Sequence, residues 1–463
     1  MYKGVAEMKD IYLVRYSVKG IKTLKELVTL SFYKKTFAKN MDTRGYNVKG
    51  IYGMNGSGKS AIITSVNILK NLLVSSEYLN NMIVQKSLEE IINKEIRELF
   101  IEADYVIEDD DYVAMFRYTI RLKKDTNGKY VIAYEHLAKK KANAQDDSMK
   151  TIFEVEDGEL LHVKEEDKFL FSLAKKTINL LESSSMCALF QKKFFFSGIS
   201  DEELRNDYRF FSIAVLHIFG RKLHVYMDNS DDHTDFLLEN SIRYYDNLED
   251  SKSEDSADLM KEYYGMDNDF IDVLSISTNV VFEKEYSKFE RRINKLYEFL
   301  HIFKSDLRGI EIDKKQYKDA YVCSLLMVYD SYKIHGEFES TGIKKLVKIF
   351  AYLEEMVRGE IVFIDEFDSN LHDVYLCALL EYLMEYGEGQ LCFTTHNVGP
   401  MDILKRNKKS IDFLSEDQKI YPWKNSGNYS PSRLYRNGMI EGSPFNIDSI
   451  DFIGIFNEEE EDE

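Results

Sequence analysis

The sequence predicts an α/β protein with an inserted, mainly helical lobe. Two short motifs lie far apart in the chain, and each joins an expected strand to polar residues at its end. Residues 53–60 read GMNGSGKS, and residues 361–368 read IVFIDEFD. Between them, from about 165 to 305, apolar residues follow a helical rather than an alternating spacing. Both motifs therefore belong to a strand-containing head, and the segment between them to an insertion.

Length and composition predict a cytoplasmic protein with more than one lobe. At 463 residues the chain exceeds what one compact core usually organises. Its 44% hydrophobic and 30% charged residues are ordinary for a soluble globular protein. Because the chain has no run of 18 apolar residues and no apolar N-terminal leader, we expect neither a membrane span nor secretion. The scattered cysteines fit a reducing cytoplasm and give no support for a zinc site: Cys187, Cys323, Cys377 and Cys392.

The charge of the chain argues against a generally DNA-binding surface. The formal net charge is −19, whereas free DNA-binding domains are usually basic, although a local groove could still be basic. Residues 458–463 are all acidic. This tail is either a disordered, solubilising segment or a contact for a basic partner.

The first elements expected along the chain are strands. Residues 11–18 and 28–33 are rich in β-branched and aromatic residues, which predicts two strands. Residues 113–122 and 130–134 alternate on either side of a DTNG turn, which predicts a β-hairpin. The polar stretch 139–151 is expected to be a loop.

Residues 53–60 fit the phosphate-binding loop G-x-x-x-x-G-K-[ST] without a gap. The context fits too, because 46–52 reads as a short strand and 61–73 as a helix; the alternative is a Gly-rich turn before a helix. Glycines let the backbone bring its N–H groups onto phosphate oxygens, and the helix N-terminus favours an anion. The lysine would pair with the β- and γ-phosphates, and the serine that follows it would bind Mg²⁺. The expected nucleotide-binding residues are Gly53, Asn55, Gly56, Ser57, Gly58, Lys59, Ser60 and Ala61, with Ser60 also a metal ligand.

The insertion is predicted from helical spacing at 169–181 and 283–300. The second of these has an apolar stripe, and a charged stretch at 246–258 reads as a linker. The expected division is a head of residues 1–160 and 310–440, a helical lobe of residues 161–309, and a C-terminal segment of residues 441–463 with the acidic tail.

The motif at 361–368 predicts a buried strand that ends in carboxylates. Four apolar residues precede Asp365 and Glu366, which would emerge at the carboxyl end of the strand, where ligands bind in open α/β sheets. Asp365 is expected to hold Mg²⁺, and Glu366 to act as general base on the attacking water. An acidic turn after any buried strand would look similar, so the motif gains its weight from the phosphate-binding loop.

Two further segments fit the same site. Residues 391–396 form a short apolar strand ending in Thr-Thr-His, so His396 could contact a γ-phosphate or the attacking water. The alternative is a histidine that caps a strand end. Residues 339–346 read ESTGIKKL, where Ser340 or its neighbour would cap a helix and Gly342 would allow close approach of an anion. An ordinary capped helix is the alternative there.

Together these segments resemble the ABC-type ATPases, especially the soluble branch of structural-maintenance-of-chromosomes, RecF-like and overcoming-lysogenization-defect proteins. In this resemblance GMNGSGKS corresponds to Walker A, and IVFIDEFD to Walker B with Glu366 as the catalytic glutamate. Residues 369–372 fall at the D-loop, and His396 falls at the switch histidine. Residues 339–342 resemble a reduced signature motif, which departs from the transporter form LSGGQ. The Q-loop is unclear, and Gln85 is the nearest candidate by position.

The resemblance covers roughly residues 10–75 and 335–435, which is less than half of the chain. It implies ATP and Mg²⁺ as ligands and ATP hydrolysis as the activity. It also implies a nucleotide-dependent dimer or higher oligomer, because in this family the signature motif of one protomer closes over ATP bound to the other. Ser340 and Gly342 would then contact ATP across the dimer.

The same resemblance extends to the ATPase subunits of bacterial anti-phage systems such as PARIS and Septu, which work with a separate Toprim or HNH nuclease. It implies a sensor or scaffold ATPase that controls such an effector, with a phage protein or nucleic acid as the trigger. The segment after His396 is expected to be too short for a Toprim domain of its own. The alternative is a DNA-repair or recombination ATPase of the RecF or SMC type that acts on DNA directly.

Overall fold

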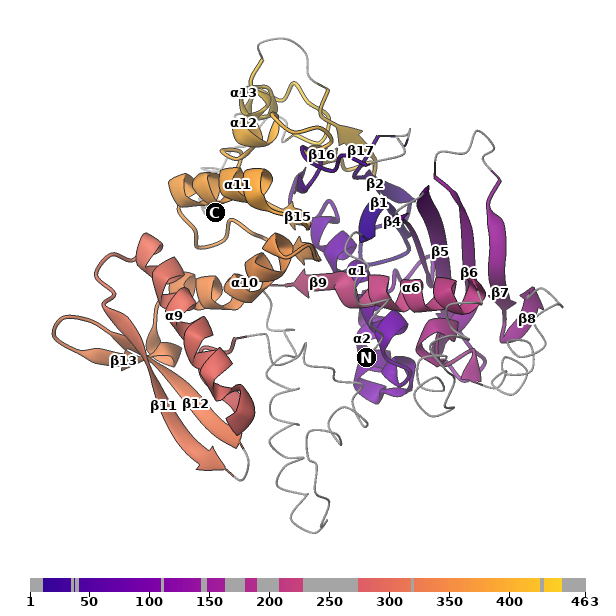
Figure 1. Ribbon diagram of the computed structural model, residues 1–463. Coiled ribbons are helices and arrows are strands. Elements are labelled where there is room, and N and C mark those ends of the chain that lie inside the picture. The colour runs from indigo at the N-terminus through magenta and orange to yellow at the C-terminus, as the bar shows by residue number, and fades with distance from the viewer. Residues whose placement is uncertain are drawn as a thin grey trace, which may run out of the picture.

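The structure of the chain is a computed structural model, in which an extended antiparallel sheet lies on one side and a smaller sheet on the other (Figure 1). A parallel sheet with helices on both faces lies between them. The structure describes residues 11–34, 37, 41–109, 112–142, 148–162, 180–189, 208–227, 274–317, 320–424 and 429–443. None of the described helices is long and apolar enough to span a bilayer.

The central sheet has six strands in the order β17-β16-β3-β15-β14-β9. All neighbours pair in parallel except β17 and β16. Ile361 and Phe363 of β14 join one hydrophobic core, whereas Val362 and Ile364 join the other, so this strand is buried on both faces. Burial on both faces explains the unbroken apolar run that predicted it. The strands are β3 (Val48–Tyr52), β9 (Leu223–Tyr226), β14 (Ile361–Ile364), β15 (Gln390–Thr394), β16 (Ile411–Leu414) and β17 (Ile420–Pro422).

Different helices cover the two faces of this sheet (Figure 1). The helices α1 (Lys59–Val74) and α6 (Tyr208–Lys222) contribute to the first core. On the other side, α9 (Tyr286–Phe303), α10 (Thr341–Val357) and α11 (Asp373–Tyr386) contribute to the second. The remaining described helices are α2 (Met82–Ile91), α12 (Met401–Leu404) and α13 (Pro431–Arg436), with 3-10 turns at Tyr78–Asn80, Glu283–Glu285 and Gly336–Phe338.

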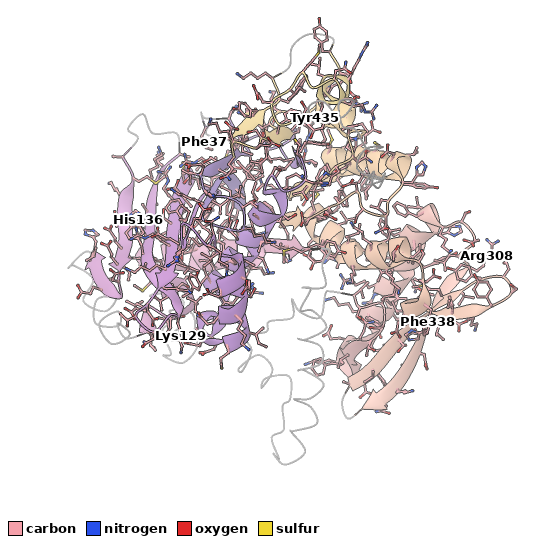
Figure 2. All side chains as sticks on the ribbon, turned by 180° about the vertical axis from the view of Figure 1, so that it is seen from behind. Phe37, Lys129, His136, Arg308, Phe338 and Tyr435 are labelled. Atoms are coloured by element: carbon pink, nitrogen blue, oxygen red, sulfur yellow. The ribbon has the colours of Figure 1, made fainter. Side chains whose placement is uncertain are left out.

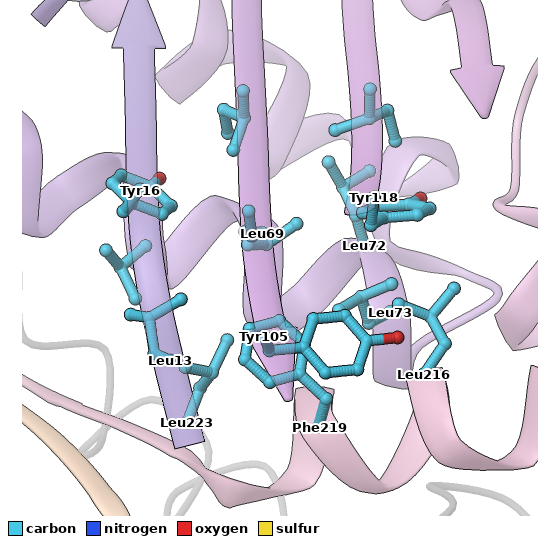
Figure 3. Packing of buried hydrophobic residues seen from close by; sticks show 14 of the residues in the cluster. Leu13, Tyr16, Leu69, Leu72, Leu73, Tyr105, Tyr118, Leu216, Phe219 and Leu223 are labelled. Atoms are coloured by element: carbon cyan, nitrogen blue, oxygen red, sulfur yellow. The ribbon is translucent and has the colours of Figure 1, made fainter. Parts of the chain in front are cut away.

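The antiparallel sheet has seven strands in the order β2-β1-β4-β5-β6-β7-β8. One face packs onto α1 and α6, where Tyr105 stacks on Phe219 with ring centroids 4.2 Å apart (Figure 3). The predicted strand at 11–18 and the hairpin are confirmed, and the strand predicted at 28–33 is confirmed over Val28–Ser31. The loop expected at 139–151 is shorter than predicted, because β6 continues to Lys141 and β7 begins at Lys150. Residues 143–147 of this loop lie outside the described residues. The strands are β1 (Ile11–Lys19), β2 (Val28–Ser31), β4 (Glu98–Asp109), β5 (Tyr112–Lys124), β6 (Tyr130–Lys141), β7 (Lys150–Glu156) and β8 (Glu159–His162).

Two buried polar contacts bind strands that are far apart in sequence. The backbone N–H of Leu13 in β1 donates to Gln390 Oε1 at 2.7 Å, and Gln390 Nε2 donates to the Leu13 carbonyl at 2.9 Å. The start of β15 is thereby fixed to the antiparallel sheet. Within the central sheet, Lys49 of β3 pairs with Asp412 of β16 at 2.6 Å, and both side chains are at most 2% exposed. Such buried pairs fix which strands are neighbours, because a wrong neighbour would leave a charge without a partner.

The third sheet consists of β10 (Asn279–Phe282), β11 (Gly309–Tyr317), β12 (Ala320–Val328) and β13 (Lys333–His335). In the view from behind, Arg308 and Phe338 mark this side of the molecule, opposite His136 and Lys129 of the antiparallel sheet (Figure 2). Buried residues of α9 and α10 and of this sheet belong to one hydrophobic core, so the third sheet is joined to the central one through these helices.

An inserted helical lobe over 161–309 is not confirmed. In its described part, β9 pairs with β14 in the central sheet, while β10 pairs with β12 in the third sheet. The helix expected at 283–300 is confirmed as α9 after a 3-10 turn, and the stripe residues Phe289, Ile293, Leu296 and Leu300 are buried. Residues 169–179 of the first expected helix, the linker at 246–258 and the acidic tail at 458–463 lie outside the described residues.

Candidate functional site

The loop at 53–60 connects the end of β3 to the start of α1. Gly53, Gly56 and Gly58 all have positive φ angles, of 156°, 77° and 107°. A Cβ on Gly53 would lie 2.4 Å from the carbonyl oxygen of Leu414, and one on Gly58 would lie 2.4 Å from Leu24 Cδ2. Both positions therefore require glycine for conformation and for space. The loop has the tight backbone path that the sequence motif predicts.

Lys59 is the buried cation of this loop. Its side-chain Nζ donates to the carbonyl oxygens of Gly53 at 2.8 Å and Met54 at 2.9 Å, and the residue is 6% exposed. Burial lowers the pKa of Lys59 to about 8, against the opposing effect of Asp365, Glu366 and a third carboxylate, that of Asp368. The lysine thus lies within electrostatic reach of the carboxylates that follow β14.

The remaining residues of the motif line the start of α1. The N–H groups of Ala61 and the next residue bond to the Gly58 carbonyl, and no side chain caps this helix end. Asn55 is exposed, Ser60 is half-buried, and Ala61 is buried in the core. The Ser57 hydroxyl is buried and makes no hydrogen bond to any described residue. An uncapped helix end beside a buried lysine fits an anion, because both favour negative charge.

Three neighbouring parallel strands deliver their last residues to one edge of the central sheet. The phosphate-binding loop follows β3, Thr394-Thr395-His396 ends β15, and Asp365-Glu366 follows β14. Asp365 is 4% exposed and accepts a hydrogen bond from the Thr394 hydroxyl at 2.5 Å. The same hydroxyl oxygen accepts the backbone N–H of Glu366 at 2.8 Å. Thr394 therefore orients both carboxylate-bearing residues, a role that the sequence analysis missed.

Glu366 has an unusual backbone conformation. Its φ is +48°, in the left-handed region that costs a non-glycine residue about 1–2 kcal/mol. Its carbonyl accepts the backbone N–H of Ser369 at 3.0 Å and also bonds the ammonium of Lys345 in α10. The side chain of Glu366 is exposed, whereas that of Asp365 is buried. Two adjacent carboxylates are thus directed differently, one inward and one toward solvent.

His396 lies in the same charged cluster. Partial burial and the nearby Lys59 ammonium lower the pKa of His396, against the opposing effect of Asp368, Glu366 and Asp365. The imidazole is therefore neutral at pH 7 and can accept or donate a hydrogen bond. Asp368 is the last residue of the acidic motif, and the sequence predicted no role for it. Its Oδ1 is buried without a hydrogen bond to any described residue, which makes it a further polar group of this site.

The segment 339–342 lies against the turn after β14 of its own chain. Ser340 accepts the N–H of Ile343 at 3.4 Å and caps α10, as expected. The Thr341 hydroxyl donates to Asn370 Oδ1 at 3.4 Å, and a Cβ on Gly342 would lie 2.9 Å from the Asn370 carbonyl oxygen. In the described part of the chain, no hydrogen bond joins Ser340 to residues 53–60.

Gln85 has a structural role. Its Nε2 donates to the carbonyls of Leu79 and Tyr130, and its Oε1 accepts the N–H of Tyr130. These bonds tie α2 to β6 and use both ends of the amide. Nothing in this arrangement supports a Q-loop role for Gln85.

The residues present fit a magnesium nucleotide. A buried cation and uncapped N–H groups suit phosphates, while Asp365 and the half-buried Ser60 supply the oxygen ligands that Mg²⁺ prefers. Among the described residues, no group of three or more His, Cys, Asp or Glu side chains could hold another metal ion. The individual roles of the site residues stay predictions.

No family model matches the chain, and no curated protein matches it. Among solved structures, it is similar to the recombination mediator protein RecF-ATPrS of the RecFOR pathway, at 13% identity and a TM-score of 0.37, over 90% of this chain and 99% of that one. It is also similar to an Smc head bound to the C-winged helix domain of ScpA, at 14% identity and a TM-score of 0.41, over 89% and 98% of the two chains. At these TM-scores the likeness does not indicate a function for this chain.

Proposed function

We propose that the chain binds ATP with Mg²⁺ and hydrolyses it, as an ABC-type ATPase, at the carboxyl edge of β3, β15 and β14. The observation that carries this proposal is the convergence, at one edge of the central sheet, of the loop that bears Lys59 after β3 and of Asp365 and Glu366 after β14. A phosphate-binding lysine beside several carboxylates is the arrangement that phosphoryl transfer to water needs, since one group holds the nucleotide and others hold metal and water.

Each residue has one step. Lys59 and the N–H groups at the start of α1 bind the β- and γ-phosphates, while Ser60 and Asp365 hold Mg²⁺, which offsets phosphate charge. Glu366, exposed at the edge of the site, takes the proton of the attacking water. His396, whose pKa is lowered by burial and by Lys59 in the nucleotide-free protein, hydrogen-bonds the γ-phosphate or that water.

Two variants separate binding from hydrolysis. Lys59→Ala should lose ATP binding, because the phosphate charge goes unpaired. Glu366→Gln should bind ATP and hydrolyse it about 10²–10⁴-fold more slowly, because the general base is lost and the shape is kept. ATP affinity by calorimetry and phosphate release test both. Wild-type turnover in Glu366→Gln would contradict the assignment of the base.

We further propose that each site is completed by Ser340 and Gly342 of a second protomer. This is supported by the hydrogen bonding of Ser340, which in the described part stays within residues 339–344 and leaves its exposed side chain accessible. The start of α10 also offers N–H groups to an anion.

Complementation tests the shared site. Ser340→Asp keeps a good N-cap residue but opposes a phosphate by charge, so it is preferable to a change at Gly342, where any Cβ meets Asn370. Lys59→Ala and Ser340→Asp chains should each be inactive alone, and their mixture should recover part of the ATPase activity. No recovery in proven mixed dimers would favour self-contained sites.

We propose as the wider role a cytoplasmic sensor or scaffold subunit that controls a separate effector, a Toprim or HNH nuclease, in bacterial anti-phage defence. The sequence resemblance supports this role, with a phage protein or nucleic acid as trigger. Co-expression with neighbouring genes tests it: capture of a nuclease whose activity differs between wild type and Glu366→Gln is the expected result. Salt-dependent binding of DNA by the chain alone, without a captured partner, would favour the repair or recombination alternative.

A further inference from the structure

We propose that Lys345 is a positioning residue for hydrolysis: it holds the backbone turn that carries Glu366, so that turnover depends on it and ATP binding does not. The inference rests on the proposed ATPase function. Lys345 lies in the second turn of α10, away from the phosphate-binding loop in sequence, and nothing in its residue type alone indicates a role at the site.

The first observation is the burial of this lysine. Lys345 is 3% exposed, although lysine is among the residues least often buried. Its ammonium donates to the backbone carbonyl of Glu366 and to the Ser369 hydroxyl. Withdrawing an ammonium from water is costly unless it is hydrogen-bonded, so these contacts explain why the side chain stays inside.

The second observation is the conformation of the turn. Glu366 and Asn370 have φ angles of +48° and +61°, and neither is glycine. Such residues persist only where their surroundings hold them. The peptide before Glu366 is held through its N–H by the Thr394 hydroxyl. The peptide after it is held through its carbonyl by Lys345 and the Ser369 N–H, and through its N–H by the Thr394 carbonyl. Fixing both peptides fixes the direction in which the Glu366 side chain leaves the backbone.

The third observation is the close fit between the turn and the start of α10. The Gly342 backbone leaves no room for a Cβ beside the Asn370 carbonyl, and the Thr341 hydroxyl bonds the Asn370 side chain. The helix that carries Lys345 is therefore seated directly on the turn, so the lysine bonds a fixed target. Loss of its donors would leave the Glu366 carbonyl with the Ser369 N–H as its remaining donor, so that side of the turn would be held less firmly while Thr394 kept its own contacts.

The test replaces Lys345 with methionine, which keeps the length and removes charge and donors. A general base displaced by about 1 Å loses on the order of 10²-fold in rate, so kcat should fall by about this factor while ATP affinity changes less than about twofold. Lys344→Met is the matched control, because Lys344 is the neighbouring lysine on the same helix and is half-exposed. This control variant should leave kcat unchanged. Lys345→Gln, which restores an N–H donor, should recover part of the rate.

A double-mutant comparison separates positioning from general structural damage. If Lys345 acts through Glu366, Lys345→Met should cause less than about a twofold further loss in a Glu366→Gln background. An equal loss in both backgrounds, or a fall in ATP affinity as large as the fall in kcat, would overturn the inference. If Lys345→Met does not fold, the same comparison with Lys345→Gln decides by the same criteria. Full wild-type turnover in Glu366→Gln alone would overturn the assignment of the base, and this inference with it, while the ATPase function would stand. Absence of ATP binding and turnover in the wild-type chain would overturn the proposed function itself.

Discussion

Raising the pH above 8 should weaken ATP binding through Lys59. Burial lowers the pKa of this lysine to about 8 in the nucleotide-free protein. Phosphate oxygens of bound ATP would stabilise the ammonium and raise this pKa again. With this pKa, about nine-tenths of the lysine is charged at pH 7 and about one-tenth at pH 9. Because ATP pairs with the charged form, its Kd should rise about tenfold over this interval, or about 1.4 kcal/mol.

Calorimetric titration of Mg-ATP at pH 7, 8 and 9 measures this effect, in the Glu366→Gln background so that turnover does not consume the ligand. Binding at pH 9 should also take up close to one proton. Lys59→Arg is the control, because a guanidinium stays charged over the whole range and its Kd should not change with pH. An equal Kd at pH 7 and 9, or the same rise in Lys59→Arg, would refute the assignment of the titrating group.

Two further predictions concern stability. Burial raises the pKa of Glu135 to about 7, so the folded state keeps a proton that the unfolded state releases near pH 4.5. The contribution of Glu135 to the free energy of unfolding should therefore fall by about 3 kcal/mol as pH rises from 4.5 to 7. Urea titrations of Glu135→Gln should lack this dependence on pH. Lys49→Met should lower the free energy of unfolding by about 3–5 kcal/mol, because it leaves Asp412 buried and unpaired. Thermal melts should show that stability recovers when Asp412→Leu is added. No recovery would mean that the ion pair stabilises the fold by more than removing the unpaired charge restores.

The parts of the site that were predictable are those whose chemistry is local in sequence. Gly53, Gly58 and Lys59 act within one loop, so their spacing alone identifies the strand, turn and helix around them. Asp365 and Glu366 were predictable because they directly follow a short apolar run. In each case residues adjacent in sequence determine the local conformation, so the sequence pattern predicts it.

The roles of Thr394 and Lys345 depend on contacts that the chain makes only when folded. Thr394 orients Asp365 because β15 lies beside β14, and no local pattern specifies that pairing. Lys345 looks like an ordinary solvent-facing lysine of an amphipathic helix until the turn after β14 packs against it. Strand β9, within the segment expected to be helical, was missed for a related reason, since a four-residue strand is too short to show a period of its own.

The order of strands in the central sheet has a consequence for the nascent chain. The phosphate-binding strand β3 is complete by residue 52, but its two neighbours, β15 and β16, begin only at residues 390 and 411. Contacts of such long sequence separation form late, because loop closure must precede them. During synthesis the antiparallel sheet can assemble first, while β3 and the phosphate-binding loop still lack their neighbouring strands β15 and β16. The chain should therefore become competent for nucleotide only after β16, which ends at Leu414, has been synthesised.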